Sequence, residues 1–164
     1  MKVSRRTLFI SVVIILNIAL DQISKVWVRS NVEYGSESPI WTDKFILTKV
    51  ENKGAFLGMG SELNEAVRII LLLVLPVIVL GIVLRYILKE KSIDRWSLFG
   101  YSCIIGGGIA NVFDRIVLGS VTDFLHIDLG GVFRTGIFNI ADVAVTTGLL
   151  IIIFASLFQR KKTV

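Results

Sequence analysis

Four long hydrophobic stretches, separated by polar segments, dominate the chain. Each holds about 20 residues, which at about 1.5 Å of rise per residue is enough for one helix to cross a bilayer. The stretches run over residues 7–28, 66–88, 96–113 and 138–158. The pattern therefore predicts four transmembrane helices, which with their connections form a single integral membrane domain over residues 1–164.

The connections over residues 29–65 and 114–137 are too long to be simple turns. Residues 44–51 alternate in part between apolar and polar side chains, which is typical of a β-strand. A similar mixed segment, residues 124–129, precedes Gly130-Gly131, a plausible turn. We therefore expect an all-α membrane bundle of four helices with a small β-sheet lying on the membrane surface.

Glycine and proline mark the irregularities that we expect. Gly54, Gly58 and Gly60 suggest a bend or a short hairpin after the first predicted strand. In the third span, Gly106–Gly108 would allow another helix to approach its backbone closely. Pro76 predicts a tolerated kink in the second span.

Composition and charge support the membrane assignment and orient it. Hydrophobic residues make up 54% of the chain and the mean hydropathy is +0.75, more than a soluble domain of this size can bury. The predicted side that holds both termini carries ten basic and two acidic residues, and the other side carries eight basic and eleven acidic ones. Both termini are therefore expected in the cytoplasm. The net charge of +5 reflects this topology and contact with membrane lipids, not binding of nucleic acid.

This orientation gathers the unusual acidic residues of the spans at the outer side. Asp21 precedes Lys25 by four residues, which predicts an ion pair on one helix face that orients the first helix. Asp114 is followed directly by Arg115, which favours an ion-paired or helix-anchoring role over catalysis. Ionisable residues beside membrane spans indicate a functional site.

Several other chemistries lack the residues that they need. A zinc site takes three or four ligands, and His126 and Cys103 are the only histidine and cysteine in the chain. Cys103 lies in an apolar helix without a histidine, so we expect an inert thiol, and His126 is most simply a surface loop residue. P-loop, dinucleotide and nucleophile-elbow patterns are absent. No metal or other cofactor is expected.

Carboxylate chemistry remains. Two aspartates that share a proton can hydrolyse a peptide bond, because the ionised one deprotonates water while the protonated one polarises the carbonyl. Asp123 in the last connection and Asp142 at the start of the fourth span are the natural pair. The residues alone leave two hypotheses open, an aspartyl hydrolase and a small membrane transporter or ion-pathway subunit that uses the same acids.

The chain resembles the bacterial lipoprotein signal peptidases, the signal peptidase II family, along nearly its whole length. The resemblance rests on Asp21-x-x-x-Lys25, Asn52-Lys53-Gly54-Ala55-Phe56, Gly107-Gly108, Asn111-x-x-Asp114-Arg115, Gly119-x-Val121-x-Asp123-Phe124 and Phe138-Asn139-x-Ala141-Asp142. Ala110 departs from the pattern, since the family commonly has glycine there. Phe56, Leu57 and Phe124 add apolar side chains near these motifs.

The resemblance implies a four-helix aspartyl protease of the bacterial cytoplasmic membrane, with an extracytoplasmic β-cradle and an active site near the outer face. It implies cleavage of diacylglyceryl-modified prolipoproteins on the amino side of the lipidated cysteine, without a cofactor, and inhibition by cyclic peptides such as globomycin. Asp123 and Asp142 match the catalytic pair. The residues matching polar substrate-binding or site-supporting positions are Asn52, Asn111, Arg115 and Asn139. Those matching structural positions are Asp21, Lys25, Asp114 and Gly54.

Overall fold

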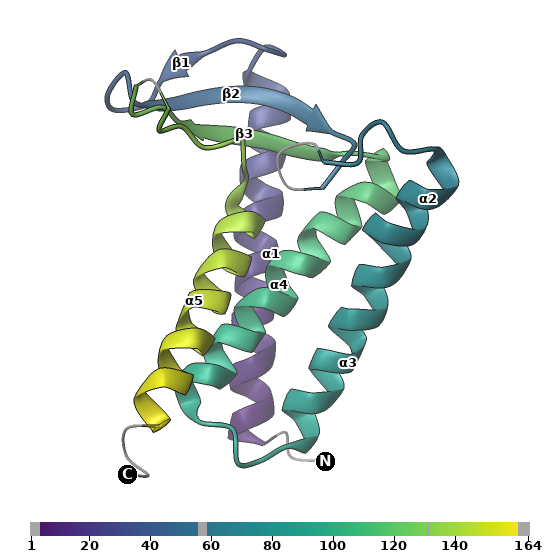
Figure 1. Cartoon of the computed structure of the whole chain (residues 1–164), viewed down its shortest axis with the longest axis vertical. Helices are drawn as coiled ribbons and strands as arrows, with labels where there is room; N and C mark the ends of the chain where they lie inside the picture. The colour runs from purple at the N-terminus through teal and green to yellow at the C-terminus, as the bar shows by residue number, and fades with distance from the viewer. Residues whose placement is uncertain (1–3, 56–58, 131, 161–164) are drawn as a thin grey trace.

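The computed structural model describes residues 4–55, 59–130 and 132–160, which form a helical bundle with a small sheet across one end (Figure 1). The helices are α1 (Arg5–Asn31), α2 (Glu65–Ile69), η2 (Ile70–Val74), α3 (Leu75–Lys89), α4 (Arg95–Leu118) and α5 (Ile140–Arg160). The strands are β1 (Ser38–Pro39), β2 (Phe45–Asn52) and β3 (Val121–Ile127). Because α2, η2 and α3 form one continuous rod, the described residues contain four helices long and apolar enough to cross a membrane, as predicted.

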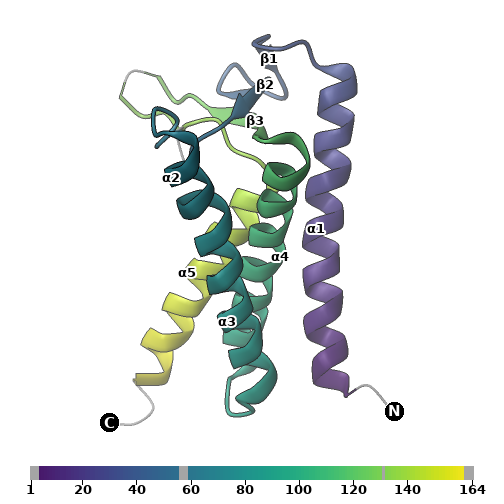
Figure 2. The same cartoon turned by 90° about the vertical axis from the view of Figure 1, so that its right-hand side faces the viewer.

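The two ends of the bundle differ, because one carries the sheet and the other does not. Figures 1 and 2 show that α4 finishes beneath the sheet and α1 beside it, whereas the start of α1 and the end of α5 lie at the opposite end. An apolar core of Ile10, Ile87, Leu98 and Ile105 lies away from the sheet. The polar residues singled out in the sequence lie at the sheet end. The apolar core and the polar candidate site residues therefore lie at different levels along the bundle axis.

Helix α4 is the central helix, and three consecutive glycines allow the other three long helices to pack closely against it. Each residue turns a helix by about 100°, so three in a row face three directions. A side chain on Gly106 would lie 2.7 Å from Asn17 of α1, one on Gly107 would collide with the backbone oxygen of Ala141 in α5, and one on Gly108 would lie 2.7 Å from Leu80 of α3. The close approach predicted for this span therefore occurs toward three helices at once.

Two helices extend beyond their predicted bounds. Helix α1 continues to Asn31, and α4 continues to Leu118, where Gly119 ends it with a left-handed φ of 75°. Asp114 and Arg115, expected in the connection after the third span, are therefore helical. The predicted span ended at residue 113 because Asp114 and Arg115 are polar, but both side chains have partners inside the protein.

The second span has an irregular first half. A π-helical turn, Ile70–Val74, ends two residues before Pro76. Proline has no N–H to donate and its ring crowds the carbonyl four residues earlier, which here is Leu72 within the π-turn. The wider turn makes room for the ring. The helical irregularity at Pro76 is thus a π-turn, and the predicted kink itself stays a prediction.

The sheet has the order β1-β2-β3 with antiparallel pairing. Strand β2 was predicted, and of the bend or short hairpin expected after it the described residues show the bend, at Gly54 and Ala55. Ala55 N donates to Met59 O at 2.7 Å and closes a turn there, and Gly58 lies outside the described residues. The partner of β2 is instead β3, about 70 residues later, with Val50 opposite Asp123. This long-range pairing brings the two outer connections together.

Candidate active site

The segment before α5 is attached to β3, and this attachment brings the two candidate aspartates together. Phe138 N donates to Leu125 O, and Leu125 N donates to Phe138 O, both at 2.8 Å. Asp123 lies two residues before Leu125 in β3, and Asp142 lies in the first turn of α5. Backbone pairing across 13 residues of sequence therefore sets the spacing of the two carboxyl groups.

Asp142 is held by a reciprocal cap at the start of α5. Asn139 Oδ1 accepts from Asp142 N at 3.0 Å, and Asp142 Oδ2 accepts from Asn139 N at 3.2 Å. This arrangement has the logic of a capping box, in which two otherwise unpaired N–H groups of a helix start are satisfied together. Asn111 Nδ2 donates to the other oxygen, Asp142 Oδ1, at 2.9 Å. Both oxygens of Asp142 therefore have fixed donors.

Asp123 lies on the buried face of β3 and is only 3% exposed. Asn139 Nδ2 donates to its Oδ1 at 2.6 Å, and Asn52 Nδ2 donates to its Oδ2 at 2.9 Å. Burial raises the pKa of Asp123 to about 6, with Asp142 adding to the increase, while the hydrogen bonds from the two asparagines and the charge of Lys25 oppose it. Asp123 therefore keeps its proton to a higher pH than an ordinary aspartate does.

Asn52 and Arg115 close the site on the side of the second span. Asn52 Oδ1 accepts from Gly54 N at 2.8 Å, a local turn that leaves its amide group free to reach Asp123 and Ala55 O. Arg115 donates to Gly54 O at 3.0 Å and to Asn111 O at 3.4 Å. The arginine thereby joins the Asn52 turn to α4.

A fully buried charge cluster lies beneath the pair. Lys25 Nζ lies 2.7 Å from Asp21 Oδ2 and 2.8 Å from Asp114 Oδ2, and all three side chains are 0% exposed. The ion pair predicted between Asp21 and Lys25 is present. Asp114, however, pairs with Lys25 and not with its neighbour Arg115. Its Oδ2 receives the charge of Lys25 but no well-directed hydrogen bond among the described residues.

The cluster reaches the site through Asn111 and through the start of α5. Lys25 Nζ donates to Asn111 Oδ1 at 2.8 Å, which leaves the amide N–H groups of Asn111 to face Asp142. Asp21 Oδ1 accepts from Ala141 N at 2.8 Å, which satisfies another N–H of the first turn of α5. The buried lysine is thus two hydrogen bonds away from the Asp142 carboxyl group.

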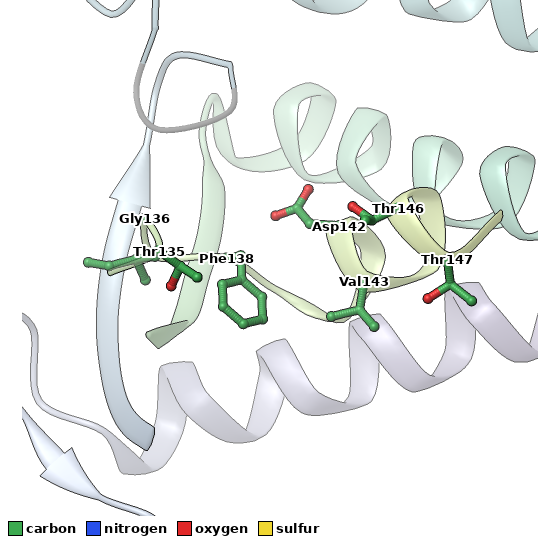
Figure 3. Close-up of a pocket in the computed structure, with 8 residues that line it drawn as sticks. Thr135, Gly136, Phe138, Asp142, Val143, Thr146 and Thr147 are labelled. Atoms are coloured by element: carbon green, nitrogen blue, oxygen red, sulfur yellow. The ribbon is translucent and has the colours of Figure 1, made fainter. Parts of the chain in front are cut away.

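Three hollows adjoin the aspartates. The smallest, about 20 Å³, has both Asp123 and Asp142 in its lining. A largely apolar pocket of about 250 Å³ lies against Asp142, Val143 and Phe138; Figure 3 shows the Asp142 carboxyl group on the opposite side of the α5 start from Val143. A polar pocket of about 580 Å³ contains Asp123 and extends to His126 and Arg134.

The described structure brings together all ten residues singled out in the sequence, in one connected network. Gln22, which the sequence reasoning missed, belongs to it, because Gln22 Nε2 donates to Asp114 Oδ1 at 2.9 Å and to Ala110 O at 3.3 Å. A polar amide beside Asp21 inside an apolar stretch was the available signal. His126 lies in β3 and not in a loop, Phe124 is buried, and Phe56 and Leu57 lie outside the described residues.

The arrangement suits acid-base chemistry on a bound water. Among the described residues, no group of three or more His, Cys, Asp and Glu side chains is arranged to hold a metal ion. Two carboxyl groups around a water-sized hollow are the chemically competent feature.

Comparison with known proteins agrees with this chemistry. Residues 13–158 match the family described as signal peptidase (SPase) II. A lipoprotein signal peptidase of Gloeobacter violaceus is 34% identical over 149 residues, which cover 91% of this chain and 82% of that protein. One from Francisella tularensis subsp. novicida is 34% identical and is covered to 91%, as is this chain. One from Psychromonas ingrahamii is 36% identical over 88% of this chain and 82% of that protein.

Solved structures of two bacterial membrane enzymes share the fold. The first has a TM-score of 0.83 at 23% identity and covers 94% of this chain and 90% of its own. The second has a TM-score of 0.79 at 22% identity, with 91% and 92% covered. The arrangement of four long apolar helices is therefore shared with known multi-pass membrane proteins.

Proposed function

The chain belongs to the signal peptidase II family, and we propose that it cleaves diacylglyceryl-modified prolipoproteins on the amino side of the lipidated cysteine, with Asp123 and Asp142 as its catalytic pair. As an aspartic-type peptidase of this family it removes signal peptides from lipoprotein precursors. Family membership sets aside the transporter alternative, because the same carboxyl groups then serve hydrolysis.

The observation that carries the proposal is the hollow of about 20 Å³ lined by both aspartates. A cavity needs about 10–15 Å³ to hold a water molecule, so this one accommodates a single water and little else. A water molecule there would have the carboxyl groups of both aspartates and the side-chain amides of Asn52 and Asn111 around it. A nucleophile between two carboxyl groups is the arrangement that aspartyl hydrolysis requires.

The unequal surroundings of the two carboxyl groups support a division of roles between them. Asp123, with its pKa raised to about 6, holds the proton, and Asp142, half-buried with a donor on each oxygen, is the base. Asp142 takes a proton from water as the water oxygen attacks the carbonyl carbon, while Asp123 donates its proton to the carbonyl oxygen. When the C–N bond breaks, Asp142 passes its proton to the leaving nitrogen and Asp123 recovers one from the diol.

The surroundings of the pair fit a lipidated peptide at a bilayer boundary. The apolar pocket beside Asp142 suits an acyl chain or apolar side chain, and the polar pocket around Asp123 suits the peptide that follows the cysteine. The charge asymmetry supports cytoplasmic termini and an extracytoplasmic sheet, so the site would face the outer leaflet of the bacterial cytoplasmic membrane. Cyclic peptides such as globomycin would compete for the same pockets.

Cleavage of purified lipid-modified precursor tests this proposal. Asp123→Asn and Asp142→Asn should each abolish turnover while leaving the protein folded, because asparagine keeps the size but not the acid-base function. The double variant should be little worse than either single one, since paired catalytic groups act as a unit. Asp43→Asn is the control, an exposed aspartate outside the network, and should retain wild-type rates.

Two results would contradict the proposal. Substantial turnover by either single variant would remove that residue from the pair. Equal initial rates on modified and unmodified precursor at the same membrane density would show that the diacylglyceryl group is not required, even if both aspartates are.

A further inference from the structure

A fourth hollow lies beside the active site, between the start of the second span and the last turns of α4. It holds about 290 Å³ and is lined by residues of α2, η2 and α4, together with Lys53 and Gly119. Figure 1 places α2 beside the sheet-side end of α4. The hollow is therefore at the level where the apolar spans meet the polar sheet end.

The polar side of this hollow has more basic than acidic side chains in its lining. Lys53, Arg68 and Arg115 line it, against the single carboxylate of Glu65. Within the described part of the chain, neither the Lys53 nor the Arg68 side chain has an ion-pair or hydrogen-bond partner, and Arg115 Nε is buried without an acceptor. Arg115 is held by the carbonyl groups of Gly54 and Asn111. The two cations left for a ligand at this membrane boundary are therefore Lys53 and Arg68, and they favour an anionic one.

The other side of the hollow is apolar and continues along the helix axis. Leu72 and Leu73 follow Arg68 by about one turn, about 6 Å, and Ile116 of α4 faces them across the hollow. No residue of α2 or η2 is buried against the rest of the protein. Cationic groups above an apolar wall match a molecule with an anionic head and a hydrocarbon tail.

We propose that this hollow binds an anionic glycerophospholipid, with its phosphate between Lys53 and Arg68 and one acyl chain along Leu72 and Leu73. Free phosphate would use the cations but not the apolar wall. The diacylglyceryl group of the proposed substrate is uncharged, so it gives the cations no partner. The bound phospholipid fills the crevice between the second span and α4, where direct packing is sparse.

Binding to the full-length protein in detergent tests the site without any assay of activity, so failure here is distinguishable from failure of the proposed peptidase function. Calorimetric titration with dioctanoyl phosphatidylglycerol should show saturable binding. Dioctanoyl phosphatidylcholine and inorganic phosphate should bind at least tenfold more weakly, because each lacks either the net charge or the tail.

Matched variants locate the binding. Arg68→Gln should weaken phosphatidylglycerol binding about fivefold, the contribution expected of one cation near a membrane surface. Arg68→Lys should restore most of it, and Glu65→Gln should strengthen it. Arg85→Gln removes an exposed arginine of the same span at the opposite end and should leave the affinity unchanged.

Three results would overturn the assignment. Equal affinity for phosphatidylcholine would show that the anionic head is not recognised, and equal affinity for inorganic phosphate would show that the tail is not. An Arg85→Gln effect as large as that of Arg68→Gln would place binding elsewhere on the protein.

Discussion

Replacing Lys25 by methionine would separate the structural role of the buried charge cluster from its role at the active site. Methionine has a similar length without the charge, so Asp21 and Asp114 would remain buried and uncompensated. Removing one partner of a buried ion pair costs about 3–5 kcal/mol. We expect the free energy of unfolding of Lys25→Met in mild detergent to fall by about this amount.

The triple variant Lys25→Met, Asp21→Asn, Asp114→Asn should recover most of this stability. Each asparagine keeps an acceptor, for Ala141 N at position 21 and for the Gln22 amide at position 114. No charge remains buried in the cluster. The triple variant therefore gives a folded protein in which the function of the lysine can be measured.

Its activity should remain low. Asn111 Oδ1 would lose the ammonium donor at 2.8 Å and keep the weaker one from Asn139 at 3.2 Å, so the amide group that faces Asp142 would lose its fixed orientation. A hydrogen bond to a charged group contributes about 1.5–3 kcal/mol, which corresponds to about a 10- to 100-fold loss of kcat. KM should change little, because Lys25 lines none of the described pockets.

Single-turnover and steady-state cleavage of lipid-modified precursor would supply kcat and KM, and unfolding in mild detergent would supply the stability. Lys49→Met is the control, since Lys49 donates only to the Arg29 carbonyl and should alter neither quantity much. Wild-type kcat in a folded triple variant would refute the link from Lys25 to Asp142. Wild-type stability in Lys25→Met would refute the cost assigned to the buried carboxylates.

Two further predictions concern Asp123 and the contact of α4 with α5. The pKa of Asp123 is about 6 in the folded state and 3.8 ordinarily, so between these pH values the folded state binds the proton more tightly than the unfolded state does. The free energy of unfolding should therefore fall by at most about 3 kcal/mol as pH rises from below 3.8 to above 6. Because the reaction needs the protonated form of Asp123, kcat/KM should decline above about pH 6. A flat kcat/KM profile from pH 5 to 8 would exclude Asp123 as the proton holder. Gly107→Ala should reduce cleavage more than tenfold, because its new methyl group collides with the Ala141 backbone and displaces the first turn of α5. Gly81→Ala, where a methyl group meets open space, should leave cleavage unchanged, and a fully active Gly107→Ala would show that this contact does not position Asp142.

The sequence predicts local features of this protein well and pairings between helices poorly. Four apolar stretches and the four-residue spacing of Asp21 and Lys25 depend only on helix geometry, and both appear in the structure. The ion-paired role expected for Asp114 is also present, but its partner is Lys25 of another helix, which the adjacent Arg115 did not indicate. The side chains of neighbouring residues in a helix point about 100° apart and do not face each other. An ion pair between Asp114 and Arg115 is therefore not expected once both residues are known to be helical.

The sheet shows the same division between local and long-range information. Alternation identified β2, but turn signals after it suggested a hairpin, whereas the strand pairs with β3. The observed register places Val50 opposite Asp123, so Asn52, two residues further on, lies diagonally on the same face and reaches the carboxyl group. Strand β1 was not predicted, since two residues that include Pro39 give no periodic signal.

The first turn of α5 explains why a short string could locate half of the proposed catalytic pair. Phe138 is attached to β3, Asn139 donates to Asp123 and caps the helix, and Ala141 lies against the bare backbone of Gly107 and donates to Asp21. Each residue type in Phe138-Asn139-x-Ala141-Asp142 thus meets a different element of the fold. Asp142 is held from the sheet, α1 and α4 together, so disturbance of any one contact should affect cleavage before it unfolds the bundle.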